Sequence, residues 1–289
     1  MTVAVWANTE KKEFWDLLPD LMSWFEKQDQ TVFLTERIVR KMKDRKAYTF
    51  SVIRSADDFL QSDFVLAMGG DGTILSAARA VGHRKTPILG VHLGGFGFLA
   101  EGGVRNVYSR LQSVIKGEYA IFPRMVLEAE IQGGETKRVF ALNDVVIDRG
   151  ESYRLMKCSV STNGRLITSY TADGLIISTP TGSTAYNLAA GGPIIAPWLS
   201  LFTVTPICPH TLSARPIVLP TQDELVVTFP DTESDLRLAA DGQVEKRLSG
   251  DDSLLIRRAS HDVQMVTFED RDYFRTLRSK MGWGQSRER

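Results

Sequence analysis

The chain has 289 residues, of which 43% are hydrophobic and 24% are charged, as expected for a globular protein with enough core for two domains. Lys plus Arg and Asp plus Glu number 35 each, so the charge balance favours neither nucleic acid nor a membrane surface as partner, and we expect a small molecule. No apolar run is long enough to span a bilayer, and the N-terminus has no basic leader with a cleavage pattern. We therefore expect a cytoplasmic protein.

Strand and helix patterns alternate over the first hundred residues. Helices are expected at 12–27 and after residue 70, where Ile74, Leu75, Ala78 and Val81 recur at helical spacing and Gly82 follows. Strands are expected at 3–6, 32–34, 64–68 and 88–91. This order predicts βαβ units around a parallel sheet.

The sequence Gly69-Gly70-Asp71-Gly72-Thr73 joins the strand at 64–68 to the helix that follows it. Glycines permit positive φ and let a ligand approach the main chain, and a helix start favours phosphate. A carboxylate in this turn suits a hydroxyl that must lose a proton, or a metal ion that bridges phosphates. The turn therefore indicates phosphoryl transfer to an alcohol, with lipid, sugar and nucleotide acceptors all open.

Other readings of this turn fit less well. No Gly-Lys-Ser/Thr follows, which excludes a P-loop, and the dinucleotide fingerprint lacks its third glycine and its acidic residue. An isolated Asp71 would be explained as a favourable charge at a helix start.

A second glycine-rich turn, 94–97, follows the strand at 88–91, and we expect both turns at the same edge of the parallel sheet.

Beyond residue 117 the segments become shorter and richer in strand-forming residues. Turn signals occur at Asn163-Gly164 and Asp241-Gly242. Strands are expected at 126–131, 139–147, 155–161, 175–177, 225–229, 236–240, 254–256 and 263–268. These features predict a second, β-rich domain, a sandwich, followed by a helix near Tyr273 and a basic tail.

Polar residues interrupt this β pattern in three places. Asn143-Asp144 breaks the strand at 139–147, where a bulge would be an equally good explanation, and Asp173-Gly174 could be a simple turn. The segment 179–187 carries four hydroxyls, an aromatic ring and an amide; Thr181 or Ser183 could cap a short helix, which accounts for one hydroxyl only. Hydroxyls beside a ring fit the ribose and base of a nucleotide.

The two cysteines, Cys158 and Cys208, lack metal or redox spacing and are expected to be buried.

Taken together, these motifs resemble those of the NAD kinase family. The matching segments, in order, are 69–73, 143–144, 178–186, 191–193, 210–216 and Met281-Gly282-Trp283. Lipid kinases of the diacylglycerol and sphingosine type share the Gly-Gly-Asp-Gly turn, whereas the Thr-Gly-Ser-Thr-Ala-Tyr and His-Thr-Leu-Ser-Ala-Arg-Pro runs are much more specific.

The resemblance implies a Rossmann-like α/β domain at 1–117, a β-sandwich domain at 118–268, and a C-terminal helix at about 269–289 that packs on the first domain. It implies phosphorylation of the 2′-hydroxyl of the adenosine ribose of NAD by ATP, with Asp71 as proton acceptor and Gly69, Gly70 and Thr73 as the phosphate-donor loop. The NAD-binding residues that it implies are Asp71, Gly72, Asn143, Asp144, Arg154, Thr171, Asp173, Thr184, Ala185, Tyr186, Asn187, Leu188, Ala189 and Gln243.

The resemblance also implies Mg²⁺ or another divalent ion that accompanies ATP and is not held by protein ligands alone, and a homodimer or homotetramer. The chain departs from the family pattern at Asp144, where Glu is usual, at Thr171, where Arg is frequent, and at His92, where Asn is common. The alternatives are a lipid or sugar kinase that shares the glycine turn, and a non-catalytic sensor of NAD or NADP.

Overall fold

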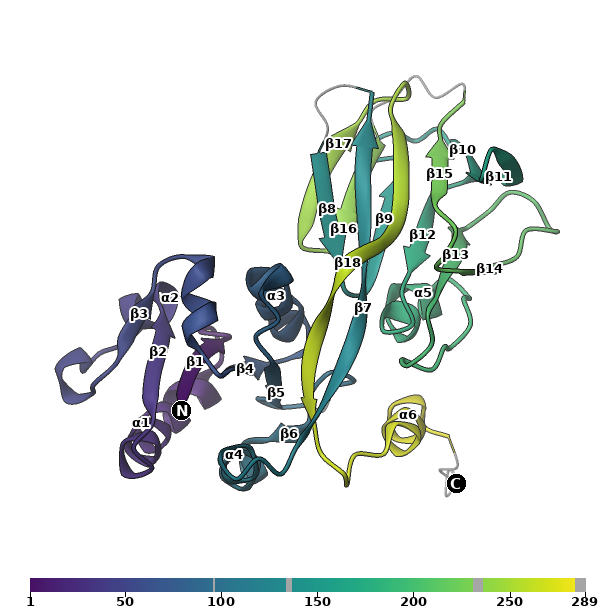
Figure 1. Ribbon diagram of the computed structural model, residues 1–289. Coiled ribbons are helices and arrows are strands. Elements are labelled where there is room, and N and C mark those ends of the chain that lie inside the picture. The colour runs from purple at the N-terminus through teal and green to yellow at the C-terminus, as the bar shows by residue number, and fades with distance from the viewer. Residues whose placement is uncertain (96, 134–136, 231–235, 284–289) are drawn as a thin grey trace. The chain divides into compact units, whose positions relative to one another are not determined.

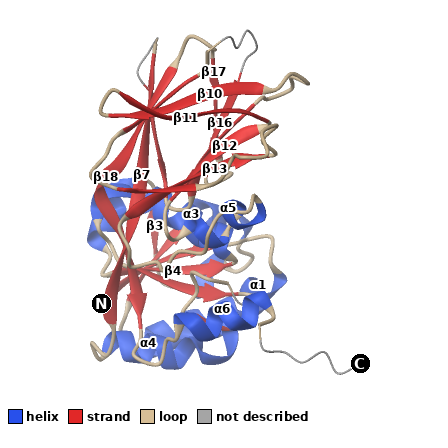
Figure 2. Cartoon of the chain, turned by 90° about the vertical axis from the view of Figure 1, so that its right-hand side faces the viewer, coloured by secondary structure: helices blue, strands red, loops and turns tan. Residues whose placement is uncertain are grey.

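The structure, a computed structural model, describes residues 1–95, 97–133, 137–230 and 236–283. The chain forms two compact units, one of Met1–Phe122 with Gln264–Arg289 and the other of Pro123–Val263. Helices dominate the outer layers of the first unit, and strands make up most of the second (Figures 1 and 2). The chain passes between the units within two long strands, β7 (Ala120–Gln132) and β18 (Ser253–Thr267).

The first unit is built on the parallel sheet that the sequence predicts. Its strands lie in the order β3-β2-β1-β4-β5, all parallel, and the end of β18 pairs with β5 through Met265 and Ile88. The strand bounds are Thr2–Ala7 (β1), Thr31–Thr35 (β2), Ser51–Ile53 (β3), Phe64–Gly69 (β4), Ile88–His92 (β5) and Gly102–Gly103 (β6). The helix bounds are Lys12–Lys27 (α1), Glu36–Lys41 (α2), Asp71–Val81 (α3), Val107–Ile115 (α4) and Tyr273–Met281 (α6).

Helices α1 and α3 show why this unit folds as its sequence pattern predicts. The buried residues of α1 fall at spacings of three and four: Phe14, Leu17, Leu18, Leu21, Met22 and Phe25. In α3 the four predicted positions are all buried, and the helix ends at Gly82, whose φ of 58° suits glycine. The predicted bounds of α1 are confirmed at both ends.

The second unit contains two antiparallel arrays of strands, as a sandwich requires. One sheet has the order β14-β13-β12-β9-β16-β17, and the other includes β11, β10, β15 and β18, with β7 and β8. The bounds are Lys137–Ala141 (β8), Asp144–Asp148 (β9), Met156–Thr162 (β10), Arg165–Ala172 (β11), Gly174–Ser178 (β12), Leu201–Ile207 (β13), Ile217–Pro220 (β14), Leu225–Thr228 (β15), Leu236–Ala240 (β16), Val244–Leu248 (β17) and, for the short helix α5, Tyr186–Ala189. One hydrophobic core draws residues from both sheets, among them Leu127, Val160, Ile147 and Leu175.

Two strand predictions are wrong in their extent. The single strand expected at 139–147 is two strands, β8 and β9, that belong to different sheets and are separated at Leu142-Asn143. The strands expected at 254–256 and 263–268 are one strand, β18. Its polar middle stays in the sheet because Arg257 pairs with Glu128 and Glu130 at 2.8 and 3.2 Å.

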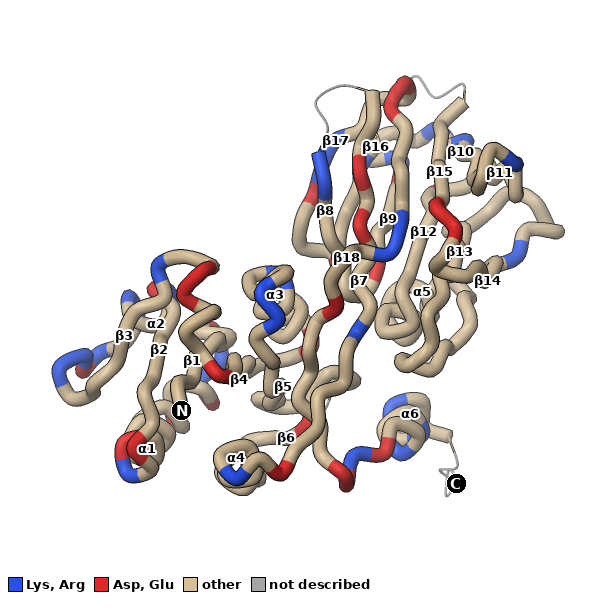
Figure 3. Tube along the Cα trace, viewed as in Figure 1, with Lys and Arg blue, Asp and Glu red and all other residues tan. Residues whose placement is uncertain are grey.

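The two cysteines differ. Cys158 is buried in the core, and burial raises the pKa of its thiol to about 12, as expected of a small hydrophobic residue. Cys208 is exposed, against expectation, because it lies at the end of β13 with a positive φ of 45°. Basic and acidic residues are spread over both units and alternate between β18 and α6 (Figure 3).

Candidate active site

In the first unit the two glycine-rich turns lie at the same edge of the sheet, which confirms the prediction. Strands β4 and β5 are parallel neighbours with Gly69 opposite His92, and the Leu93 N–H donates to the Gly69 carbonyl at 3.2 Å. Helix α3 begins at Asp71, directly after β4. Asp71 therefore lies at the carboxyl edge of a parallel sheet, where such sheets bind ligands.

In the first glycine turn, position 69 requires glycine for close approach and not for positive φ. None of Gly69, Gly70 and Gly72 has a positive φ; Gly94, in the second turn, has one of 137°. A Cβ atom at Gly69 would lie 2.6 Å from the Thr73 Cβ atom, so only glycine lets the first turn of α3 pack on the end of β4.

The Asp71 carboxylate is held by the second glycine turn. Its Oδ2 atom accepts the Phe98 N–H at 2.9 Å, and its Oδ1 atom accepts the Leu99 N–H at 3.1 Å. A Cβ atom at Gly97 would lie 2.6 Å from the Asp71 Cγ atom, so glycine at 97 makes room for the carboxylate. Two backbone donors fix the orientation of a charged group strongly because each bond is charge-assisted.

In the second unit the Asn143-Asp144 pair and the hydroxyl-rich segment lie together. Ser178 is registered opposite Asp144, and the Thr179 N–H donates to the Asn143 carbonyl at 2.8 Å. The Asn143 side-chain amide is half-buried and makes no hydrogen bond with any residue in the described ranges. It is therefore available to a ligand.

Asp241, whose Asp-Gly sequence indicates only a turn, fixes the backbone of this pair. Its carboxylate accepts three N–H groups, from Leu142 at 3.0 Å, Asn143 at 2.7 Å and Asp144 at 3.2 Å, and its own N–H donates to the Asp144 carbonyl at 2.9 Å. Asp241 has a positive φ of 52°, which lets the β16–β17 turn point its carboxylate inward. Gln243 lies in the same turn.

Asp144 is a buried carboxyl group with an altered acidity. Its residue is 5% exposed. Burial, and after it the negative charge of Asp241, raises the pKa of Asp144 to about 7. Asp144 therefore changes its protonation state near neutral pH.

The hydroxyls of segment 179–187 are mostly internal. Thr179 donates to the Leu142 carbonyl at 2.6 Å, and Ser183 donates to the Pro180 carbonyl at 2.7 Å and accepts the Ile195 N–H at 2.9 Å. Neither Thr181 nor Ser183 caps the following short helices with its side chain, so helix capping, the alternative explanation, accounts for neither hydroxyl. The Thr184 hydroxyl also bonds within the segment, to the Thr181 carbonyl at 3.4 Å. The buried hydroxyls of Thr179 and Ser183 stabilise the fold of the segment, because a buried hydroxyl must be hydrogen-bonded.

Asn187 is buried, and its side chain is fully used within the protein. Its amide nitrogen donates to the Ser183 and Pro193 carbonyls, and its amide oxygen accepts the hydroxyls of Thr203 and Thr205 at 3.1 and 2.7 Å. Two donors and two acceptor positions are the whole capacity of an asparagine amide. The Asn187 side chain therefore holds α5 against β13.

The remaining expected NAD-binding residues of this segment are accessible. Tyr186 is 46% exposed, and burial of the rest of its ring, with the charge of nearby Asp148 next in size, raises the pKa of its phenol. Ala185 and Ala189 are exposed, and Thr184 and Leu188 are half-buried. Tyr186 thus presents a ring face on which a base can stack.

The other expected residues follow on β11, β12 and their loops. Asp173 forms an ion pair with Arg149 at 3.0 Å, and no sequence pattern predicts this partner. The Thr171 carbonyl accepts the His210 N–H at 2.9 Å, which brings the 210–216 motif beside β11. Arg154 is exposed in the loop before β10, and its N–H donates to the Ser152 hydroxyl.

Comparisons with known proteins agree with this arrangement. The family model of the ATP-NAD kinase N-terminal domain matches residues 4–119, and that of the C-terminal domain matches residues 142–268. An NAD kinase of Geobacter sulfurreducens is 38% identical over 285 residues, which cover 98% of this chain and 99% of that protein. This chain belongs to the ATP-NAD kinase family.

Further ATP-NAD kinase relatives and structures point the same way. An NAD kinase of Gemmatimonas aurantiaca is 45% identical over 77% of this chain and 78% of its own length. The crystal structure of a yeast NADH kinase complexed with NADH has a TM-score of 0.88 at 25% identity, and covers 99% of this chain and 89% of that one. An NAD kinase from Archaeoglobus fulgidus in complex with ATP shares the fold, with a TM-score of 0.75 at 23% identity, and covers 99% of this chain and all of that one.

Two other kinds of site are absent from the described residues. Nowhere in the described part of the chain do three or more His, Cys, Asp or Glu side chains gather so that they could hold a metal ion. Among the same residues, no helix is both long and apolar enough to cross a membrane.

Proposed function

We propose that this chain is an NAD kinase, which transfers the terminal phosphoryl group of ATP to the 2′-hydroxyl of the adenosine ribose of NAD and so forms NADP. Both domain models of the family match, and relatives similar over nearly the whole chain are NAD kinases. The observation that carries the mechanism is the Asp71 carboxylate, fixed by two backbone N–H groups at the edge of a parallel sheet.

Asp71 is the proposed proton acceptor. The Phe98 and Leu99 N–H groups take one acceptor position on each of its oxygens, which leaves further lone pairs for the substrate hydroxyl. A carboxylate is a weak base toward an alcohol. It takes the proton as the bond from oxygen to phosphorus forms, in the way proposed for the catalytic aspartate of protein kinases.

The β-rich unit supplies the proposed recognition of NAD. Asn143, whose amide is available, hydrogen-bonds the adenosine portion, Tyr186 stacks against the base, and Asp144 and Asp173 bind polar groups of the ligand. Gly72, Arg154, Thr171, Thr184, Ala185, Leu188, Ala189 and Gln243 complete the proposed site. Asn187 contributes through the position it gives α5, because its side chain is fully used.

Gly69, Gly70 and Thr73 form the proposed loop for the phosphate donor, at the start of α3, where the helix dipole favours negative charge. In this proposal magnesium enters with ATP as part of the substrate. When bound, it offsets charge on the transferring phosphates. That the chain forms a homodimer or homotetramer, and that it is located in the cytoplasm, both stay predictions.

A donor and acceptor panel tests this function. Purified protein with NAD, ATP and Mg²⁺ should form NADP, detected with a dehydrogenase that is specific for NADP. EDTA should abolish turnover and leave the melting temperature unchanged, because the metal acts with ATP. Phosphorylation of diacylglycerol or a sphingoid base in place of NAD would indicate a lipid kinase, and tight binding of NAD without turnover would indicate a sensor.

A further inference from the structure

Arg271, in the short segment between β18 and α6, contacts the turn that holds Asp71. Its Nη2 atom donates to the Phe98 carbonyl at 3.1 Å. The Phe98 carbonyl and the Leu99 N–H are the two ends of one peptide group, and that N–H donates to the Asp71 Oδ1 atom. One planar peptide therefore has Arg271 bonded at one end and Asp71 at the other.

This geometry couples the two side chains mechanically and electrically. The peptide group is planar and rigid, so a rotation that frees its carbonyl from Arg271 also moves its N–H away from Asp71. A cationic donor on the carbonyl polarises the peptide and strengthens the bond that its N–H makes to a carboxylate. The orientation of Asp71 thus depends on Arg271.

Arg271 is itself held on two sides. Its Nε atom lies 3.3 Å from the Glu101 Oε1 atom, and the two side chains are only 15% and 8% exposed. The Glu101 N–H donates to the Gly90 carbonyl in β5 at 2.9 Å, and the Arg271 N–H donates to the Phe268 carbonyl at 3.0 Å. The Arg271–Glu101 pair is therefore anchored to the central sheet through Glu101 and to the end of β18 through Arg271.

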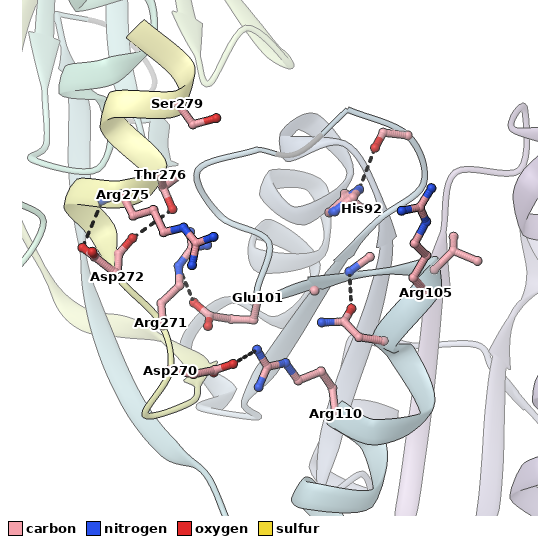
Figure 4. Close-up of a pocket in the computed structure, with 15 residues that line it drawn as sticks. His92, Glu101, Arg105, Arg110, Asp270, Arg271, Asp272, Arg275, Thr276 and Ser279 are labelled. Atoms are coloured by element: carbon pink, nitrogen blue, oxygen red, sulfur yellow. Dashed lines mark hydrogen bonds and ion pairs between the residues drawn. The ribbon is translucent and has the colours of Figure 1, made fainter. Parts of the chain in front are cut away.

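The acidic residues next to Arg271 in the chain, Asp270 and Asp272, have other partners. Figure 4 shows Arg271 directed toward Glu101 in the wall of a cavity of about 820 Å³, with the Arg110–Asp270 ion pair, at 2.8 Å, beside it. Asp270 is already paired with Arg110, and the Asp272 carboxylate accepts the Arg275 N–H at the start of α6. Glu101 and the Phe98 carbonyl are two of the groups that hold the Arg271 side chain.

We propose that Arg271 is a positioning residue for phosphoryl transfer, which holds the Phe98–Leu99 peptide so that Asp71 keeps the orientation needed to accept the proton. The proposal rests on the proposed role of Asp71. Arginine suits this task because Nε and Nη2 of one rigid guanidinium serve two acceptors at once, whereas a lysine ammonium is a single point donor.

The test compares Arg271→Gln and Arg271→Lys with Arg275→Gln as a matched control. Arg275 is exposed, lies one helical turn away, and its side chain has no hydrogen bond or ion pair with the residues that the structure describes. We expect Arg271→Gln to lower kcat about 10- to 100-fold, since misplacement of a reacting group by about 1 Å costs up to that much. The KM for NAD should change less than about threefold.

Arg271→Lys should recover part of the loss, and Arg275→Gln should match the wild type in both constants. A drop in kcat with an unchanged KM separates positioning from a general loss of structure, and melting temperatures identify any variant that does not fold. Wild-type kcat in Arg271→Gln, or in Arg271→Lys if the first variant does not fold, overturns the inference. Asp71→Asn, assayed alongside, separates the two ideas: if it keeps wild-type turnover, the proposed role of Asp71 has failed instead.

Discussion

Gly97→Ala would add one methyl group beside the Asp71 carboxylate. Its Cβ atom would lie 2.6 Å from Asp71 Cγ and 2.7 Å from Asp71 Oδ2. Because carbon atoms pack at about 3.5 Å or more, the carboxylate would have to move by about 1 Å. Gly97 has no positive φ, so alanine suits the backbone and the clash is the whole perturbation.

A displacement of that size costs about 10²-fold in turnover when it affects a reacting group. The strain of overpacking is about 1–3 kcal/mol, so the melting temperature should fall by only a few degrees. The assay is steady-state formation of NADP at saturating NAD and Mg–ATP, with calorimetric titration of NAD to show that the site still binds.

Gly95→Ala is the matched control, because a Cβ atom there meets nothing within 4 Å and the residue lies in the same turn. It should keep nearly wild-type turnover. Wild-type turnover in Gly97→Ala would show that the position of the Asp71 carboxylate does not limit the reaction.

Three further predictions concern the β-rich unit. The folded-state pKa of Asp144, about 7, lies above the ordinary value of 3.8, so the unfolding free energy should fall as pH rises from about 4 to 7, by up to roughly 4 kcal/mol. Asp144→Asn should remove this dependence, and thermal melts from pH 4 to 8 measure it; an equal slope in both proteins would contradict the assignment. Asp241→Asn leaves one acceptor oxygen for three N–H groups, so the KM for NAD should rise about tenfold, and an unchanged KM would argue against Asp241 as the support of Asn143. Asn187→Ala leaves buried polar groups without partners and should lower stability by about 2–4 kcal/mol in a denaturant titration; a loss below about 1 kcal/mol would show that the amide is not essential to packing.

Local patterns were enough to predict the central elements of the first unit, namely β1, α1, β2, β4, α3 and β5, but not α2, β3, β6 or α4. The period of α1, the glycine after α3 and the two turns after parallel strands are all recorded in neighbouring residues, and the structure confirms them. Asp71 was also predictable as a candidate, because its turn combines glycines, a helix start and a carboxylate within five residues.

Contacts between a side chain and backbone groups far away in the sequence were not predictable. Asp241 binds backbone N–H groups about a hundred residues away, and Arg271 binds a carbonyl, so neither contact leaves a pattern in side-chain types. The hydroxyls of segment 179–187 suggested a ligand, yet Thr179 and Ser183 turn inward to satisfy buried carbonyls. Sequence gives the residue types at such a site, whereas their direction depends on the strands packed against them.

The Asp71→Asn variant tests whether Asp71 accepts the proton of the ribose hydroxyl. The substitution keeps the size of the side chain and an oxygen for one backbone N–H, and removes the group proposed to accept the proton. The measurement is kcat for formation of NADP, with NAD affinity determined by calorimetry on the same preparation. We expect kcat to fall at least about 10³-fold and NAD affinity to change by less than about threefold. Turnover within a few-fold of wild type would show that Asp71 is not the proton acceptor.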